Sequence, residues 1–395
     1  MSAPDFAITG NDMFGRPVAV AISDGRIASV RSAGPSSVPR DLWIFPGLID
    51  IQVNGFGGHD LNAAQPTPDA VAGVTRALWR HGVTRFCPTI CTAAHEQMMA
   101  ALRATARACD EEEWVGRAVA GIHVEGPYIS PEDGPRGAHP ADHVRAPDWR
   151  EFEAFQEAAG GRIRVVTLAP ERPGALEFIE RLSRAGIVPA IGHTAAARED
   201  IRAAVLAGAR LSTHLGNGAH ATLPRHPNYI WAQLAEDGLW ASLIVDGHHL
   251  PPDVVKVFTR AKGAGRCLLI SDAVWLADQP PGRYHFLGSG VDLTPDGKVR
   301  LGSSGYLAGS VLDLAAAVAN IVRFAGLGVP DAVAMAARHP ARLLGRTDLG
   351  ALVPGNRADV VLVRWSPGDG ALRVVQTVVD GTIVYRGGGD VTESR

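Results

Sequence analysis

The sequence from Pro46 to about Gly350 alternates between strand-like and helix-like segments, and this alternation limits the possible folds more than any other feature. Helix-like segments such as 68–81 and 175–185 repeat apolar residues at spacings of three and four. Strands separated by crossover helices predict a closed parallel barrel, an α/β fold of the (β/α)8 or TIM-barrel type. The predicted strands are 47–55, 85–91, 118–129, 164–170, 188–194, 210–217, 239–247 and 267–273.

The two ends of the chain differ from this middle part, because both carry short β-prone runs. Asp24-Gly25 near the start and Asp380-Gly381 near the end each separate two such runs, and Asp-Gly is a strong signal for a hairpin turn. Because both ends of the chain carry such β-prone runs, we predict one small domain built from the two ends together. The expected domains are a β-sandwich from 1–46 and 350–395 and a barrel from 47–349, with a hairpin or lid inserted at 279–309.

Composition and charge exclude several classes of protein. The net charge of -3 provides no basic field for nucleic acid and no polybasic patch for a membrane surface. No apolar run is long enough to span a bilayer, and the first residues lack the pattern of a secretory signal, so we expect a cytoplasmic protein. Cys87 and Cys91 would face the same side of one strand, where buried thiols are a commoner arrangement than a soft-metal pair.

Three potential metal ligands lie at the ends of three different predicted strands. Glu125, His193 and His214 each end an apolar run, and the C-terminal ends of barrel strands converge on one mouth. A single histidine at a strand end is more often a hydrogen-bonded structural residue. One carboxylate with two imidazoles, however, suits a catalytic zinc ion with one position left open for water, and also tolerates other divalent metals. We therefore predict one divalent metal, with zinc as the expected ion.

Other residues at the same mouth could move protons or orient the ligands. Asp272 ends the eighth predicted strand and could exchange a proton with water and a leaving amine, although an aspartate here could instead cap a helix. His123 shares strand parity with Glu125 and is either a partner that orients a ligand or an interior hydrogen-bonded histidine. His139, in the following loop, could donate a hydrogen bond to a substrate carbonyl.

The first predicted strand and two later loops complete the candidate site. Gln52 and Asn54 lie on one face of the first strand, and because amides bind zinc poorly, they favour one metal over two. His249 follows the seventh strand, and Arg225 lies in a turn-rich loop after the sixth. Histidine and arginine both suit an anionic substrate group, and arginine binds phosphate or carboxylate with two donors. A surface arginine is usually only solvated.

Together these residues resemble the amidohydrolase superfamily, and within it the N-acetylglucosamine-6-phosphate deacetylase family. The resemblance covers nearly the whole chain in the family's order, and its motifs are specific only when taken together. The matching segments are 46–55, 121–128, 137–139, 168–171, 192–194, 213–215, 246–249, 271–273 and 307–310.

The resemblance implies a barrel with a β-sandwich from both termini, a homodimer, and hydrolysis of the N-acetyl amide of an amino sugar phosphate. It implies metal binding by the residues matching Glu125, His193 and His214, and proton transfer by the one matching Asp272. The family's carbonyl-polarising histidine matches His139, and the amides at Gln52 and Asn54 match its one-metal branch. Sugar and phosphate contacts are implied for Asn217, Gly218, Arg225 and His249, with the arginine reaching across the dimer.

One segment departs from the family pattern. An aromatic residue and then Asn-Ala-Met usually follow the leucine after the second metal histidine, whereas this chain has Gly216-Asn217-Gly218-Ala219-His220. The segment belongs to the sugar and phosphate pocket, so the substrate is open between N-acetylglucosamine-6-phosphate, N-acetylgalactosamine-6-phosphate and a non-phosphorylated sugar. A non-catalytic protein on a hydrolase-like barrel is the more distant alternative, because fold does not fix function.

Overall fold

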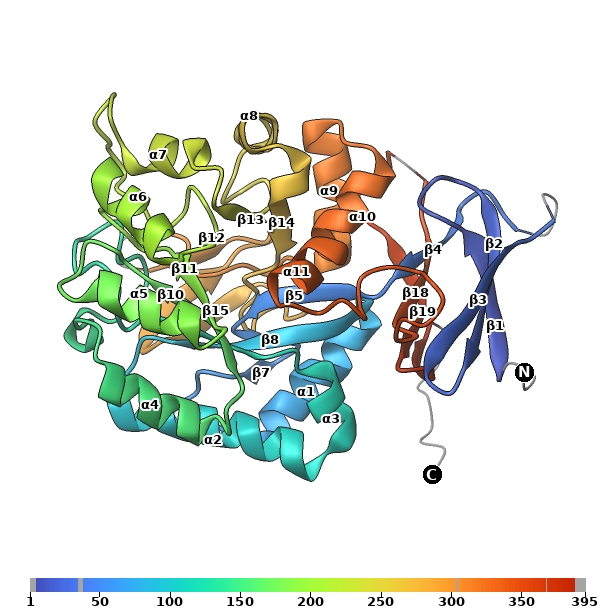
Figure 1. Cartoon of the computed structure of the whole chain (residues 1–395), viewed down its shortest axis with the longest axis horizontal. Helices are drawn as coiled ribbons and strands as arrows, with labels where there is room; N and C mark the ends of the chain where they lie inside the picture. Colours follow the sequence, from blue (N-terminus) through green and yellow to red (C-terminus); the bar gives the residue numbers. More distant parts are fainter. Residues whose placement is uncertain (1–4, 35–37, 303–304, 367, 388–395) are drawn as a thin grey trace.

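The structure, a computed structural model, describes residues 5–34, 38–302, 305–366 and 368–387. Its centre is an eight-stranded parallel sheet whose neighbouring strands follow one another in the sequence (Figure 1). All eight predicted strands are observed, although the third and sixth are much shorter than predicted. The strands are β5 (Leu48–Val53), β8 (Val83–Cys91), β9 (Ile122–Glu125), β10 (Ile163–Leu168), β11 (Val188–Ile191), β12 (Leu211–Ser212), β13 (Trp240–Ile244) and β14 (Cys267–Ile270).

Contacts between the first and last strands close this sheet into a barrel. The backbone N–H of Asp272 donates to the carbonyl of Gln52 at 3.0 Å, and that of Asn54 donates to the carbonyl of Ala273 at 2.8 Å. All nine residues of β8 are buried, as expected for a parallel strand covered on both faces. The predicted (β/α)8 fold is therefore confirmed, and the carboxyl ends of its strands meet at one mouth.

Helices surround the barrel, and several begin at side chains that cap their first turn. Thr67 accepts a hydrogen bond from the N–H of Ala70, and Asn228 accepts from Ile230 and Trp231. The helices are α1 (Pro68–Arg80), α2 (His95–Glu111), α3 (Glu113–Ala118), α4 (Trp149–Ala158), α5 (Ala175–Arg184), α6 (Arg198–Ala207), α7 (Tyr229–Ala235), α8 (Pro252–Lys262), α9 (Leu314–Ala325), α10 (Val329–Ala336) and α11 (Arg338–Leu343), with short 3-10 turns η1 (Ala141–His143) and η2 (Ala264–Arg266).

A second sheet, beside the barrel, is assembled from both ends of the chain (Figure 1). Its order is β20-β19-β18-β4-β1-β2-β3, and β4 pairs with β18 antiparallel. Both predicted Asp-Gly hairpins are confirmed, with positive φ at each turn residue. We propose 1–46 with 350–395 and 47–349 as the two domains. The strands are β1 (Phe6–Asn11), β2 (Pro17–Ser23), β3 (Arg26–Ser32), β4 (Leu42–Pro46), β18 (Val360–Arg364), β19 (Arg373–Val379) and β20 (Thr382–Arg386).

The segment predicted as an insertion after the eighth barrel strand forms a small antiparallel sheet of β15 (Gly282–Phe286), β16 (Ser289–Leu293) and β17 (Val299–Leu301). It packs around its own apolar cluster, which includes Phe286 and Leu293. A two-stranded hairpin, β6 (Gly55–Phe56) with β7 (His59–Asp60), follows β5. Across the described residues, every helix is too short or too polar to span a lipid bilayer.

Candidate active site

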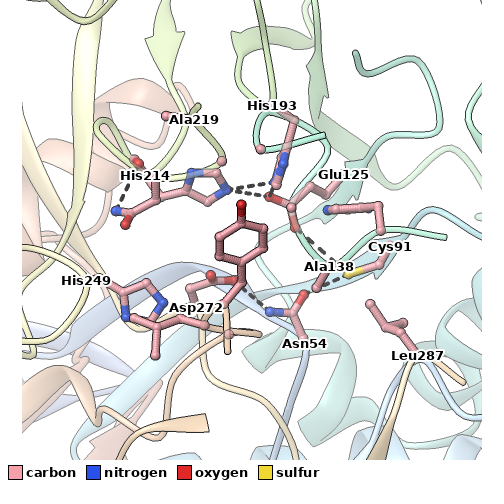
Figure 2. Close-up of a pocket in the computed structure, with 18 of the residues that line it drawn as sticks. Asn54, Cys91, Glu125, Ala138, His193, His214, Ala219, His249, Asp272 and Leu287 are labelled. Atoms are coloured by element: carbon pink, nitrogen blue, oxygen red, sulfur yellow. Dashed lines mark hydrogen bonds and ion pairs between the residues drawn. The ribbon is translucent and has the colours of Figure 1, made fainter. Parts of the chain in front are cut away.

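A cavity of about 270 Å³ opens at the carboxyl ends of the barrel strands. Most of the residues predicted to form a site line it, together with side chains of the inserted sheet (Figure 2). Parallel barrel strands deliver their C-terminal residues to one face, which is why side chains far apart in sequence meet here. The predicted residues in its wall are Asn54, Glu125, His139, His193, His214, Asn217, Gly218, His249 and Asp272.

Glu125, His193 and His214 form a buried cluster in the wall of this cavity (Figure 2). Nε2 of His214 lies 2.9 Å from Oε1 of Glu125 and 3.1 Å from Nε2 of His193. Nε2 of His193 lies 3.4 Å from the same carboxylate oxygen. Zinc ligands at about 2.0–2.1 Å lie roughly 3.3 Å apart around a tetrahedral ion. The three atoms therefore fit one metal ion with little movement.

The tautomer of His193 is set by its other ring nitrogen. Nδ1 lies 2.8 Å from the carbonyl oxygen of Pro135 and must donate to it, which leaves the Nε2 lone pair pointing at the cluster. A backbone carbonyl behind a histidine is a common arrangement at metal sites. Across the residues that the structure describes, this is the one cluster of histidine, cysteine and carboxylate groups with suitable geometry for an ion. The chemistry of the donors therefore fits a divalent metal.

Three site residues adopt a left-handed backbone conformation directly after their strands. The φ angles are 50° at His193, 31° at His214 and 51° at Asp272. Such a conformation costs a residue other than glycine roughly 1–3 kcal/mol and is concentrated at functional sites. The surrounding barrel holds these three residues where their side chains face the cavity.

Asp272 is buried beside the cluster and is held by two amides at the end of β5, Gln52 within the strand and Asn54 directly after it. Nδ2 of Asn54 donates to Oδ1 of Asp272 at 2.7 Å. Nε2 of Gln52 lies 3.2 Å from the same oxygen and 2.8 Å from Oε1 of Glu125. Burial and the nearby charge of Glu125 raise the pKa of Asp272 to about 6. The arrangement suits a carboxylate that gains and loses a proton near neutral pH.

His139 and His249 line the cavity from loops on different sides. Nδ1 of His139 lies 2.8 Å from the hydroxyl of Thr92, and its ring packs edge-on to His193. Burial lowers the pKa of His139 to about 3, so the ring is neutral. Nδ1 of His249 lies 2.6 Å from Oδ2 of Asp246, and each ring therefore has its Nε2 available for a ligand.

His123 lies deeper in the barrel than the predicted metal ligands. Its Nδ1 is 3.0 Å from the carbonyl of Ile51 and its Nε2 is 2.7 Å from the hydroxyl of Thr167. Both ring nitrogens are therefore used within the barrel interior, and neither contacts Glu125. Burial lowers its pKa to about 4, so it is neutral. Of the two predicted alternatives, the contacts favour the interior hydrogen-bonded histidine.

The segment that departs from the family pattern forms one wall of the cavity. A Cβ added at Gly218 would lie 2.7 Å from Nδ1 of His193, and one added at Gly216 would lie 2.9 Å from the ring of Phe258. Both glycines have positive φ. His220 also lines the cavity, and its ring lies 3.0 Å from the hydroxyl of Tyr229. The small residues are thus required by the local packing.

Arg225 lies outside the cavity of its own chain. It is exposed and does not line the wall, and no arginine or lysine in the described part of the chain does so.

Several residues that were not predicted as site residues also lie in the cavity wall. Cys91 lies there, with Sγ 3.1 Å from Oδ1 of Asn54, while Cys87 does not. The position of Cys91 at the end of a predicted strand was the available signal. The inserted segment contributes Phe286, Leu287, Tyr306 and Leu307.

Comparisons with known proteins agree with this geometry. The model of the amidohydrolase family matches residues 43–384. The chain is 36% identical to N-acetylgalactosamine-6-phosphate deacetylase of Escherichia coli O157:H7, over 92% of this chain and 93% of that one. It is 33% identical to N-acetylglucosamine-6-phosphate deacetylase of Bacillus subtilis, over 93% and 92%.

A solved structure is also similar. It is a variant of N-acetyl-D-glucosamine-6-phosphate deacetylase from Mycobacterium smegmatis in complex with N-acetyl-D-glucosamine-6-phosphate, and it matches with a TM-score of 0.86 and 29% identity. The match covers 97% of this chain and all of that chain. Family model, relatives and fold agree over nearly the full length. The chain belongs to the amidohydrolase family, in the branch that contains these deacetylases.

Proposed function

We propose that the protein hydrolyses the N-acetyl amide of N-acetylglucosamine-6-phosphate to give glucosamine-6-phosphate and acetate. The observation that carries this proposal is the convergence of Glu125, His193 and His214 beside Asp272 in one cavity. Relatives with this activity by name, similar over more than nine-tenths of the chain, support the substrate class. Three buried ligand groups and a separate proton-transfer group are what metal-assisted amide hydrolysis needs.

The metal that we assign to Glu125, His193 and His214 is zinc, one ion per subunit, because two imidazoles and a carboxylate suit it. When bound, the ion supplies electrophilic activation of water and of the acetyl carbonyl. The carboxylate of Asp272 takes a proton from the attacking water. It then returns this proton to the sugar nitrogen as the C–N bond breaks, so that acetate and a free amine leave.

The remaining cavity residues orient the substrate in this proposal. His139, held through Nδ1 by Thr92, presents Nε2 as a hydrogen-bonding group near the acetyl carbonyl. His249, fixed by Asp246, contacts the sugar or its phosphate, together with Asn217 and Gly218. Gln52 joins Glu125 to Asp272 and keeps the ligand and the base in a fixed relationship.

A homodimer completes the phosphate site in this proposal. The described lining of the cavity contains no cationic side chain of the guanidinium or ammonium type, although the proposed substrate is an anion. Arg225 is exposed on a loop after β12 and is available to a neighbouring subunit. We also assign the protein to the cytoplasm, which agrees with four free, buried cysteines.

Complementation tests the role of Arg225. Asp272→Asn and Arg225→Ala subunits, each inactive alone, should regain activity when they are unfolded and refolded together. In a mixed dimer, one site combines the intact Asp272 of one subunit with the intact Arg225 of the other. Failure to regain activity in a confirmed mixed dimer would place Arg225 in its own subunit's site, and an active Arg225→Ala protein would place it outside both sites.

N-acetylgalactosamine-6-phosphate is the second candidate substrate. A deacetylase of this sugar phosphate, 36% identical, is among the relatives, and the wall formed by 216–220 departs from the glucosamine-type pattern. The two substrates differ only in the configuration of one ring hydroxyl. A single changed wall of the cavity could therefore alter the preference without altering the reacting groups.

A substrate panel tests both proposals. Acetate release by zinc-loaded protein should be measured from N-acetylglucosamine-6-phosphate, N-acetylgalactosamine-6-phosphate and unphosphorylated N-acetylglucosamine. A kcat/KM highest for the first supports the proposed substrate, and one highest for the second supports the alternative. Equal rates with and without the phosphate would contradict phosphate recognition. Absence of acetate from all three would contradict the deacetylase proposal.

A further inference from the structure

A second cavity, of about 380 Å³, lies at the end of the barrel opposite to the candidate active site. Its wall includes Arg85 near the start of β8 and Arg162 directly before β10. The starts of parallel strands lie on the face opposite to their carboxyl ends, where the metal ligands are. Five of the nine lining residues are arginines and one is an acid, Glu113; the arginines are Arg85, Arg117, Arg162, Arg346 and Arg357.

Arg85 belongs to the fixed part of this cavity. Its side chain is 2% exposed. Nε and Nη2 donate to the two carboxylate oxygens of Asp359 at 2.6 and 2.9 Å, and Nη2 also donates to Asp380 at 2.8 Å. The adjacent carboxylates hold the pKa of Arg85 above its ordinary value despite burial. A charged group is thus held rigidly at the cavity wall, so ordering it for a ligand costs little.

Arg346 and Arg357 approach from the C-terminal part of the chain and share one carboxylate. Arg346 donates to Asp348 through Nε and Nη2, and Arg357 donates to it through Nε at 2.9 Å. Nη1 of Arg357 donates to Asp380 at 2.8 Å. Nη1 of Arg346 and Nη2 of Arg357 have no acceptor in the described part of the chain, although both guanidinium groups are held in place.

Arg117 and Arg162 come from the barrel side and are more exposed. Nη2 of Arg117 donates to Glu113 at 2.5 Å, and Nη2 of Arg162 donates to Asp110. Their side chains are 42% and 31% exposed. Nε and Nη1 of Arg117 and Nε of Arg162 find no acceptor among the described residues. These arginines therefore carry spare donors beside a cavity with one acidic side chain in its lining, while Asp110, Asp348, Asp359 and Asp380 pair with its arginines from behind the wall.

We propose that this cavity binds a small, doubly charged anion of the phosphate type, separately from the candidate active site. Guanidinium groups match the oxygens of tetrahedral anions with paired donors. The carboxylates fix the arginines from the side and leave several N–H groups unused. A cavity with several such donors offers charge-assisted hydrogen bonds, which are about twice as strong as neutral ones.

The position of the cavity gives the bound anion a structural consequence. Arg117 and Arg162 belong to the barrel, whereas Arg346 and Arg357 belong to the segment that leads into the terminal sheet. An anion between them would connect the two parts of the molecule. A ligand that binds only the folded form raises the unfolding temperature. The proposed site is therefore expected to couple anion binding to the stability of the whole chain.

Calorimetric titration of the zinc-loaded protein with inorganic phosphate, and separately with sulfate, at constant ionic strength tests this proposal. We expect the anion to bind. We also expect the same affinity in His249→Ala, which changes the candidate active site. The double variant Arg117→Ala/Arg162→Ala should weaken it at least about tenfold, equivalent to 1.4 kcal/mol. Arg184→Ala is the matched control, because Arg184 forms a similar exposed helical pair with Glu180 outside the cavity.

Two results would overturn the proposal. One is that phosphate and sulfate bind to the folded double variant as tightly as to the wild type, whether or not His249→Ala loses binding. The other is that neither anion shows saturable binding to the wild-type protein at concentrations up to about 10 mM. Arg117→Gln alone provides the same comparison should the double variant not fold. None of these measurements depends on deacetylase activity.

Discussion

Nδ2 of Asn54 donates a 2.7 Å hydrogen bond to Oδ1 of Asp272, and this contact joins the first barrel strand to the loop after the last. The carboxylate is oriented from one side, while no described residue donates to its Oδ2. An amide at this position holds the carboxylate without binding an ion of its own. The pair therefore fixes the orientation of Asp272 beside the cluster of Glu125, His193 and His214.

Replacing Asp272 by Asn should separate metal binding from proton transfer. The metal ligands are Glu125, His193 and His214 in our proposal, so the zinc content measured by mass spectrometry should stay at that of the wild type. Acetate release should fall by about 10²–10⁴-fold, the usual contribution of a positioned base. Turnover within a factor of two of the wild type would remove Asp272 from the mechanism.

Replacing Asn54 by Leu should shift the pH dependence of activity. Burial raises the pKa of Asp272, and the hydrogen bond from Asn54 opposes this effect by stabilising the ionised form. Loss of the bond raises the pKa further. Because the base acts when ionised, the acid limb of the kcat/KM profile should move to higher pH. Cys91→Ser, a change at the other side of Asn54, should leave the limb in place.

Gly218→Ala should weaken metal binding by displacing His193. The added Cβ would lie 2.7 Å from Nδ1 of His193. The φ of 55° also adds about 1–2 kcal/mol of backbone strain. Gly174→Ala is the control, because Gly174 has a similar φ of 80° but open space around the added atom. Zinc affinity measured by competition with a chelator should fall only for Gly218→Ala, and an equal fall in both would contradict the steric explanation.

Arg85→Met should destabilise the fold strongly. The change would leave Asp359 and Asp380 buried without their shared cation, a situation that costs about 3–5 kcal/mol. Denaturant unfolding should show this as a lower midpoint. Arg16→Ala, which breaks an exposed pair with Asp12, should change stability by about 1 kcal/mol at most. Similar losses in both variants would show that burial of the network is unimportant.

His81 should make stability depend on pH in the alkaline range. Burial alone would lower its pKa, but Asp278 and Asp313 overcome burial and raise it to about 10. The protonated form is therefore favoured by folding, and its contribution is complete below about pH 6.5 and lost as the pH rises through 10. The free energy of unfolding should fall between pH 7 and 10 more steeply in the wild type than in His81→Gln. Parallel curves would contradict this assignment.

Much of the fold and part of the site could be predicted from the sequence. Alternating segments predicted every barrel strand, because a buried parallel strand is a continuous apolar run. Glu125, His193, His214 and Asp272 were found because strand ends converge by geometry. The sequence could not show that Gln52 joins Glu125 to Asp272, since that contact depends on side-chain direction across the barrel.

Other features depend on tertiary packing and were beyond sequence reasoning. In the sequence, Gly216 and Gly218 only indicate smaller residues than the family pattern has. The structure shows that neighbouring rings occupy the space where larger side chains would lie. Arg225 was expected to reach the substrate across a dimer; in its own chain it is exposed, and its role there stays a prediction. The arginines of the second cavity are scattered from 85 to 357 and share no local pattern.

The pairing of β4 with β18 also determines when folding can be completed during synthesis of the chain. Pro46 lies opposite Val360, so one edge of β4 stays unpaired until more than three hundred further residues have left the ribosome. At about 5–20 residues per second this takes on the order of 15–60 s. Throughout that interval an unsatisfied strand edge is exposed. The nascent chain is therefore expected to need protection by chaperones until its last strands emerge.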